Sequence, residues 1–210
     1  RCLELAEQGA QPVASAADVC QQCRTIFLSL PDSTVVAEVI EEIRSKLQSG
    51  DIVIDTTTGN PRDTRHACQL LAAGGISYLD ATLAGSSVQV RSREGLMLIG
   101  GDASAVSNCQ PLLDTISDHA LHLGPSGAGA TMKLVVNLVL GLNRAVLAEG
   151  LSLGEACGLE TEQVLAVLRQ SPAYSSVMDT KGSKMILGDF APQARLAQHL
   201  KDVQLILQLG

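Results

Sequence analysis

The sequence predicts an α/β fold, a parallel sheet flanked by helices, followed by an all-helical region. Two observations support this fold class. Up to residue 125, short apolar runs rich in strand formers alternate with helical patterns of about three turns, which is typical of βαβ units. Beyond that point the apolar residues recur only at helical spacing. We therefore expect two domains, residues 1–125 and residues 126–210.

The elements of the first region are placed by apolar runs and the residues that interrupt them. A helical pattern covers residues 1–8 and is stopped by Gly9. Residues 25–30 form a short strand, which Pro31 ends, and Asp32 or Ser33 then caps a helix that extends to Leu47. Further strands are expected at 52–54, from 78, at 96–99 and at 119–123, and further helices from 61 and over 106–116.

The second region contains only helical patterns. A long apolar helix occupies residues 130–154, and shorter helices are expected over 161–169, 177–187 and 196–209. The long segment has the length of a membrane span, but it carries Lys133, Arg144 and Glu149, which are costly in lipid. We therefore predict a buried helix, apolar on every side, and no membrane partner.

Composition and charge limit the class of function. The 210 residues are 46% hydrophobic and 18% charged, which is too apolar for a disordered chain. A net charge of −7 and an aromatic content of 2% argue against nucleic-acid binding. No metal site is expected, because no second ligand pair follows Cys20 and Cys23, which we place at a helix-to-strand junction. Scattered cysteines and the lack of a signal-like run predict a cytoplasmic protein.

Three strand ends could contact a ligand, because open α/β sheets bind ligands at the carboxyl ends of their strands. These are Leu30 with Pro31, the polar run at 55–60, and the segment at 80–86. The threonines at 56–58 offer hydroxyls just before a helix, which suits ribose or phosphate contacts. An ordinary polar loop that caps the helix is an equally weighted alternative.

A glycine-rich loop at residues 124–129 follows a strand and opens the long helix. A phosphate-binding loop has this appearance, but here the helix is too long and leads to no second strand. The favoured interpretation is a flexible, close-packed hinge.

Lys133 and Asn137 are four residues apart and so share one face of the long apolar helix. A lysine that extends to solvent is the commoner explanation of such a pattern. A partly desolvated ammonium, in contrast, has a lowered pKa and can exchange protons near neutral pH. Lys201 and Asp202 are similarly ambiguous, because such a pair on a terminal helix is usually solvated.

Taken together, these segments resemble the β-hydroxyacid dehydrogenase family over essentially the whole chain. The matching segments, in family order, are FLSLP at 27–31, DTTT at 55–58, YLDA at 78–81, GGD at 100–102, GPSGAGATMKLVVN at 124–137 and KDVQL at 201–205. The resemblance implies a Rossmann-type dinucleotide-binding domain at 1–125, an all-helical domain at 126–210, and NAD or NADP as cofactor.

The resemblance also implies roles for individual residues. It makes Lys133 the catalytic lysine and Asn137 its substrate-orienting partner. The cofactor would be contacted by Leu30, Pro31, Thr58 and Lys201.

The substrate loop departs from the family pattern. Ala84, Gly85 and Ser86 stand where the family has Ser-Gly-Gly, so the first serine hydroxyl is lost and Ser86 is expected to supply another nearby. Thr82 replaces a proline, and Val136 replaces the first residue of an Asn-Asn pair. These changes bear on the substrate more than on the chemistry.

The start of the chain departs further, because the family's Gly-x-Gly-x-x-Gly turn and its strand are absent from the sequence. Residues 1–9 match the helix that follows the family's second strand, and the family continues with more helix beyond residue 210. We therefore expect these residues to be part of a longer chain, and NAD cannot be distinguished from NADP.

The implied function is interconversion of a small β-hydroxyacid and its semialdehyde or keto acid by an NAD(P)-dependent oxidoreductase, with Lys133 as general acid and base. The expected partners are a small carboxylic-acid substrate and further copies in a homodimer or homotetramer. The alternatives are a non-catalytic oligomerisation or protein-binding module of the same fold, and a reductase of an imine or a larger acid.

Overall fold

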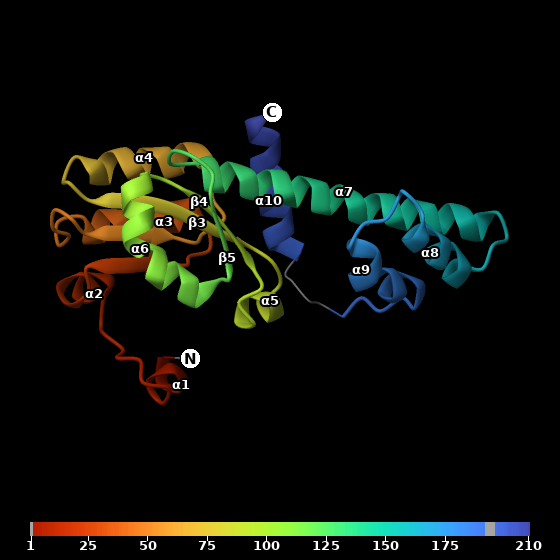
Figure 1. Cartoon of the computed structure of the whole chain (residues 1–210), viewed down its shortest axis with the longest axis horizontal. Helices are drawn as coiled ribbons and strands as arrows, with labels where there is room; N and C mark the ends of the chain where they lie inside the picture. The colour runs from red at the N-terminus through yellow and green to blue at the C-terminus, as the bar shows by residue number, and fades with distance from the viewer. Residues whose placement is uncertain (1, 192–195) are drawn as a thin grey trace. The chain divides into compact units, whose positions relative to one another are not determined.

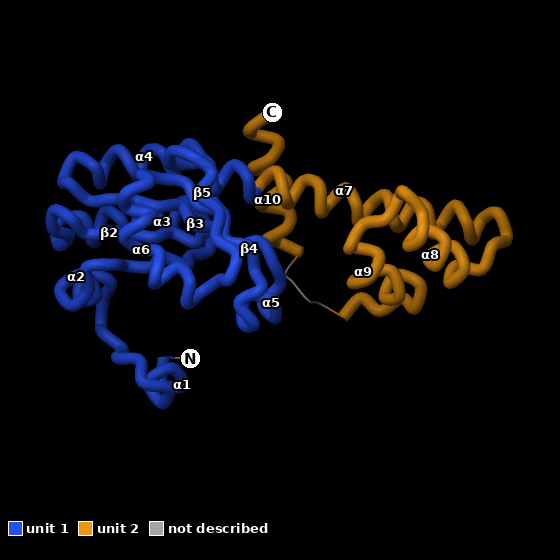
Figure 2. The backbone as a smooth tube through the Cα atoms, viewed as in Figure 1, with its two compact units in different colours: residues 1–133 blue, residues 134–210 orange. Residues whose placement is uncertain are grey.

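The computed structural model describes residues 2–191 and 196–210, so Arg1, the first residue of the helix expected at 1–8, lies outside the described residues. The chain forms two compact units, residues 1–133 and residues 134–210 (Figure 2). The units meet inside one long helix, α7 (Ala128–Ala156).

Unit 1 is built on a five-stranded sheet (Figure 1). The strands are β1 (Thr25–Leu28), β2 (Ile52–Asp55), β3 (Ser77–Ala84), β4 (Leu96–Gly100) and β5 (His119–His122), and their spatial order is the chain order. The predicted fold class is confirmed. One pairing differs from a fully parallel sheet, because β4 runs antiparallel to β3. Only the short helix α5 (Ser87–Arg91) and a turn connect these strands, whereas parallel neighbours need a longer crossover.

The helices of unit 1 begin where the sequence provides caps. They are α1 (Cys2–Ala6), α2 (Ala16–Gln22), α3 (Ser33–Ile43), α4 (Pro61–Ala72) and α6 (Ala103–Ile116). Of the two candidate caps of α3, the N-cap is Asp32, whose carboxylate accepts from the N–H groups of Thr34 and Val35. Cys20 lies in α2 and Cys23 ends it just before β1, which confirms the predicted helix-to-strand junction.

Helices pack on both faces of the sheet, as predicted. Val53 and Tyr78 belong to a core cluster with residues of α2, α3 and α4. The next residue on each strand, Ile54 and Leu79, belongs to a second cluster with residues of α6. This alternation follows from the two-residue side-chain period of a strand.

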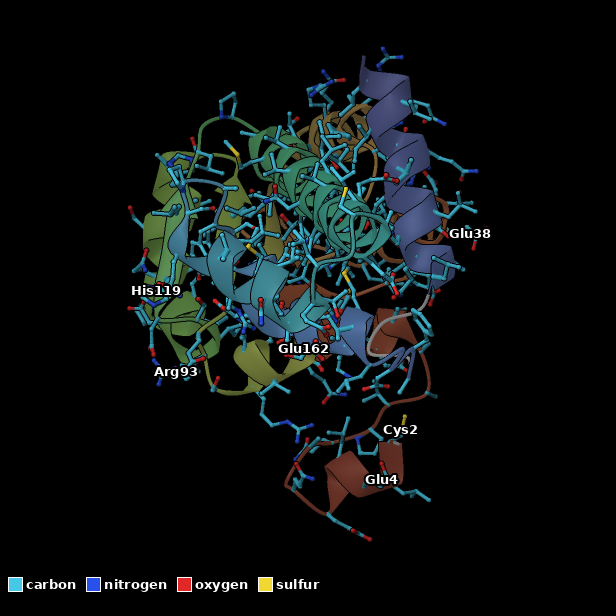
Figure 3. The ribbon with its side chains drawn as sticks, turned by 90° about the vertical axis from the view of Figure 1, so that its right-hand side faces the viewer. Cys2, Glu4, Glu38, Arg93, His119 and Glu162 are labelled. Carbon is cyan, nitrogen blue, oxygen red and sulfur yellow. The ribbon has the colours of Figure 1, made fainter. Side chains whose placement is uncertain are left out.

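The turn between α5 and β4 is held by Asp118, the residue just before β5. Arg93 has a positive φ of 65° and forms an ion pair with Asp118. Its carbonyl oxygen accepts from the Asp118 N–H at 2.9 Å. Figure 3 shows Arg93 and His119, the first residue of β5, at the same edge of the unit.

Unit 2 contains α8 (Thr161–Gln170), α9 (Val177–Ile186), α10 (Leu196–Leu209) and the larger part of α7. Its core joins Leu147 and Leu151 of α7 with Leu165 of α8 and Met178 of α9. The predicted helices over 161–169, 177–187 and 196–209 are confirmed to within a residue.

The prediction that the long helix is buried on every side is wrong for the described residues. Val139, Leu142 and Val146 of α7 are exposed, whereas Leu147 and Leu151 are buried. The reason is that α8 and α9 cover only one face of α7. By length and composition alone α7 could cross a membrane, which is weak evidence for a span.

Candidate functional site

The loops that follow β1 and β2 are joined by hydrogen bonds. The Leu30 N–H donates to Thr57 Oγ1 at 3.0 Å, and the Thr56 hydroxyl donates to the Leu28 carbonyl oxygen at 2.9 Å. Two of the three threonines therefore hold the loop structure, in line with the polar-loop interpretation. The same bonds bring together the loops that carry Leu30, Pro31 and Thr58, the residues predicted to contact the cofactor.

A glycine allows these two loops to approach each other closely. The Asn60 N–H donates to Ser33 Oγ at 2.8 Å, which ties the start of α4 to the start of α3. A Cβ atom on Gly59 would lie 2.5 Å from Ser33 Oγ. A larger residue at position 59 would separate the loops.

Asp55, the last residue of β2, is a buried carboxyl group at the base of this loop pair. It is 5% exposed and accepts from the Tyr78 hydroxyl at 2.6 Å and from the Thr57 N–H at 2.9 Å. Burial raises the pKa of Asp55, and the hydrogen bonds from Thr57 and Tyr78 oppose that rise. Burial and the neighbouring Asp55 likewise raise the pKa of Tyr78.

A second buried carboxylate, Asp80 of β3, holds the start of α7. Asp80 is 2% exposed, and its two oxygens accept from the N–H groups of Gly127 and Ala130, each at 2.8 Å. Burial raises the pKa of Asp80, and these hydrogen bonds oppose the rise. Sequence reasoning missed this role, although a charged residue inside an apolar strand must find partners.

The glycine-rich loop packs directly against the sheet. A Cβ atom on Gly129 would lie 2.4 Å from the Leu98 carbonyl oxygen, and one on Gly100 would lie 2.7 Å from both Asp80 carboxylate oxygens. The Thr82 hydroxyl donates to the Gly129 carbonyl oxygen at 3.2 Å. The close packing predicted for this loop is therefore present. Because Asp80 takes the N–H groups that a phosphate would need, the loop is not arranged as a phosphate cradle.

Lys133 and Asn137 lie one turn apart on α7, and Lys133 is half-buried. Asp80 holds the first turn of α7 on β3, and Lys133 lies about one turn beyond Ala130, the last residue that Asp80 binds. Lys133 is the last residue of unit 1, and Asn137 belongs to unit 2.

Within unit 2, Asp202 connects the predicted site residues Asn137 and Lys201. The Asn137 amide donates to Asp202 Oδ2 at 2.9 Å, and Lys201 Nζ lies 3.8 Å from Asp202 Oδ1. The side chains of Lys201 and Asp202 are only 26% and 15% exposed. The pair is therefore not on a fully solvated face, and Asp202 is a second residue whose role the sequence did not indicate.

The loop predicted to bind substrate begins where β3 ends, at Ala84. Gly85 has a φ of +155°, and Ser86 is the N-cap of α5. The Ser86 hydroxyl accepts from the Gln89 N–H at 3.3 Å and donates to Gln89 Oε1 at 3.0 Å. The hydroxyl expected to replace the lost serine is thus engaged in a local capping box.

The residues of the loops that follow β1 and β2 fit part of a dinucleotide site. A nucleotide cofactor in an open α/β sheet lies at strand carboxyl ends and beside helix N-termini. The joined loops after β1 and β2 offer such strand ends, with backbone and hydroxyl groups and no bulky side chain at Gly59. In the described residues, no group of three or more His, Cys, Asp or Glu side chains could hold a metal ion.

Comparison with known families gives two matches that together cover nearly the whole chain. Residues 1–124 match the model of the NAD binding domain of 6-phosphogluconate dehydrogenase. Residues 127–210 match the NAD-binding model of NADP-dependent 3-hydroxyisobutyrate dehydrogenase.

Individual relatives agree with these matches. The chain is 33% identical over 204 residues to a 2-(hydroxymethyl)glutarate dehydrogenase of Eubacterium barkeri, covering 95% of this chain and 66% of that protein. It is 28% identical over 213 residues to the cytokine-like nuclear factor N-PAC of Aedes aegypti, covering all of this chain and 38% of that protein. The chain thus spans less than two thirds of the length of both.

A solved structure shows the same fold. The Mycobacterium tuberculosis 3-hydroxyisobutyrate dehydrogenase described with L-serine superposes with a TM-score of 0.92 at 23% identity, covering 99% of this chain and 74% of that chain.

The Rossmann-type sheet and the two matched models place this chain in the class of proteins with NAD-binding domains. The chain belongs to the β-hydroxyacid dehydrogenase family. The predicted cofactor, NAD or NADP, is confirmed at the level of the two matched domains. The roles assigned to individual site residues stay predictions.

Proposed function

We propose that the protein is an NAD(P)-dependent oxidoreductase that interconverts a small β-hydroxyacid and its semialdehyde or keto acid, with Lys133 as general acid and base. The observation that carries this proposal is the placement of Lys133 and Asn137 on α7. Asp80 anchors the start of that helix to the sheet, and Asp202 holds the Asn137 amide. Both residues are therefore held in defined positions, as acid–base chemistry requires.

The chemistry follows from the residue types. NAD(P)H, when bound, supplies the hydride. A carbonyl that accepts hydride becomes an alkoxide, and the Lys133 ammonium donates the proton that completes the alcohol. In the oxidative direction the neutral amine accepts the hydroxyl proton. Asn137 orients the same substrate oxygen, and Asp202 limits how its amide can rotate.

The relatives support a small acid as substrate. A matched family model is named for 3-hydroxyisobutyrate dehydrogenase, and one relative is named for 2-(hydroxymethyl)glutarate. Both named compounds carry a carboxylate and a hydroxyl group. The cytoplasmic location and the homodimer or homotetramer stay predictions of the sequence.

The test is Lys133→Ala in the full-length protein, assayed with NADH and NADPH against a panel of small semialdehydes and hydroxyacids. We expect kcat to fall by about 10²–10⁴-fold, because general-acid catalysis contributes about this much, while cofactor affinity is unchanged. Lys46→Ala, at an exposed lysine, is the matched control and should leave kcat unchanged. A near-normal kcat in Lys133→Ala would refute the assigned role.

A second candidate is a non-catalytic, protein-binding module of the same fold. It is favoured by the relative named as a nuclear factor and by the loss of the serine hydroxyl at Ala84. Two measurements together separate the candidates, the fluorescence of added NADH or NADPH and the turnover of a carbonyl substrate. A fluorescence change on adding NADH or NADPH, followed by turnover of a carbonyl substrate, supports the enzyme. Turnover of imines or larger acids alone would support a reductase with a different substrate.

A further inference from the structure

A cavity of about 350 Å³ lies in unit 1 between α3 and α4, with residues of the sheet at its floor. Its lining shares Asp55, Thr57 and Gly59 with the loop pair of the candidate cofactor site, but it includes none of the residues predicted to contact the cofactor or the substrate. The volume is at the lower end of the range of small-molecule sites. The cavity is therefore large enough for a compact organic molecule.

The walls and the floor of the cavity differ in chemistry. Val36, Ala37 and Ile40 of α3 face Ala67 and Leu70 of α4, so this part of the walls is hydrocarbon. The floor carries the buried pair of Asp55 and Tyr78. An apolar cavity with a few convergent polar groups is the usual form of a ligand site.

The polar floor offers hydrogen-bond acceptors. The Tyr78 hydroxyl donates its one proton to Asp55 Oδ2 at 2.6 Å, so its oxygen can only accept further bonds. The ionised Asp55 carboxylate is also an acceptor only. Among the ion pairs of residues 2–191 and 196–210, none includes Asp55. A matching ligand must therefore supply N–H or O–H donors.

Charge at the rim selects among possible donors. The carboxylates of Glu41 and Asp63 also line the cavity, and the only basic side chain of its lining is His66. Together with Asp55, this gives three carboxylates to one imidazole. An anion would be repelled, whereas a cation would be attracted.

From this combination we propose that the cavity binds a small organic ammonium ion with an apolar body. The ammonium donates to Asp55 and Tyr78, and the hydrocarbon part packs between Ala67 on α4 and Val36 on α3. Burial of Asp55 supports this assignment, because an ammonium compensates a carboxylate that is removed from water. The proposal does not depend on the proposed dehydrogenase activity.

The ligand test compares 2-phenylethylamine, protonated at neutral pH, with the neutral 2-phenylethanol of nearly the same shape. Binding is measured by isothermal titration calorimetry and by amide chemical shifts of residues in α3 and α4. We expect the amine to bind saturably and at least about tenfold more tightly than the alcohol, which is 1.4 kcal/mol. Equal affinities, or no saturable binding of the amine, would overturn the proposal.

Variants locate the binding. Asp55→Asn should weaken amine binding about tenfold and leave alcohol binding unchanged, because the shape is kept and the charge is removed. Glu38→Gln is the matched control, since Glu38 lies on α3, is exposed and is not part of the lining (Figure 3). An equal loss in both variants would show a general charge effect and overturn the site.

A second pair of variants tests whether the amine occupies the cavity, and this test does not depend on Asp55. Ala67→Leu fills the cavity and should abolish amine binding. Ala72→Leu adds the same side chain at an exposed position of α4 and should not change it. Unchanged amine affinity in Ala67→Leu would place the ligand elsewhere and refute the proposal. Because none of these measurements uses turnover, failure here is distinct from failure of the proposed function.

Discussion

The Asp80 carboxylate accepts a hydrogen bond of 2.8 Å from the backbone N–H of Gly127, 47 positions further along the chain. Its other oxygen accepts from Ala130, so one buried side chain in β3 binds the first turn of α7. A carboxylate at this place also complements the positive end of the helix dipole. The start of α7, which carries Lys133 within unit 1, is therefore held by a residue of the sheet.

Replacing Asp80 should destabilise unit 1. Asp80→Ala leaves two buried N–H groups without an acceptor, and we expect the free energy of unfolding to fall by about 2–5 kcal/mol. Asp80→Asn retains one acceptor oxygen and should lose less. The measurement is urea unfolding followed by circular dichroism.

Asp102→Ala is the control for the Asp80 variants. Asp102 also accepts from two backbone N–H groups, those of Ser104 and Ala105 at the start of α6, but it is exposed to water. Water can replace its hydrogen bonds, so its loss should be clearly smaller. An equal effect of the two substitutions would show that burial of Asp80 adds nothing to its anchoring role.

Two glycines of α7 should respond to alanine in opposite directions. In Gly129→Ala the new Cβ atom meets backbone, 2.4 Å from the Leu98 carbonyl oxygen, so we expect a loss of about 1–3 kcal/mol from overpacking. In Gly150→Ala the nearest atom is Leu168 Cδ1 at 3.8 Å, and the higher helix propensity should add about 0.5–1 kcal/mol. Thermal unfolding checks both, and a stabilised Gly129→Ala would contradict the close packing of the loop.

The local elements of this fold could be predicted because their signals are local. The strand at β2 is a short apolar run, and Pro61 with Asn60 before it marks the start of α4. The antiparallel pairing of β4 could not be predicted, since the apolar run at Leu96–Gly100 reads alike in either direction. Strand direction depends on the connection, whose short helix α5 has only five residues.

The site was predictable only in part for the same reason. Lys133 and Asn137 are related by helical spacing, which is visible in the sequence. Asp80 and Asp202 act through partners 47 to 65 positions away, and no periodic pattern links such pairs. A carboxylate in an apolar segment of the sequence indicates that it needs a partner, but it does not indicate which residue that partner is.

The pH dependence of stability should carry the signature of Asp55. Burial raises the pKa of Asp55 in the folded protein above its ordinary value of 3.8. As pH rises past this ordinary value, the unfolded chain loses the Asp55 proton before the folded protein does. The stability that Asp55 contributes is therefore fully present below the ordinary pKa and is lost as pH rises through the folded pKa. Asp55→Asn does not titrate. Its stability relative to the wild type should therefore increase as pH rises from about 4 to 8.

The measurement is urea unfolding of both proteins across this pH range, and Asp102→Asn is its control. Hydrogen bonds from Ser104 and Ala105 lower the pKa of Asp102, so its contribution is present above the ordinary value and is lost only as pH falls below it. The difference between Asp102→Asn and the wild type should stay flat from about pH 5 to 8. A flat difference for Asp55→Asn as well would contradict the raised pKa.

Ala84→Ser tests whether the altered loop after β3 limits the proposed reaction. The resemblance to the family implies a serine at this position, and the nearby Ser86 hydroxyl is engaged with Gln89 in the cap of α5. A hydroxyl at position 84 should add a hydrogen bond to the substrate carboxylate, and a bond to a charged group is worth about 1.5–3 kcal/mol. We therefore expect kcat/KM for small β-hydroxyacids to rise at least about tenfold, with cofactor affinity unchanged.

Ser86→Ala, measured alongside, should lower the stability of α5 without such a gain. If Ala84→Ser lowers kcat/KM for every small acid while turnover of larger acids persists in the wild type, the alanine is an adaptation to a bulkier substrate, and the small-acid assignment falls.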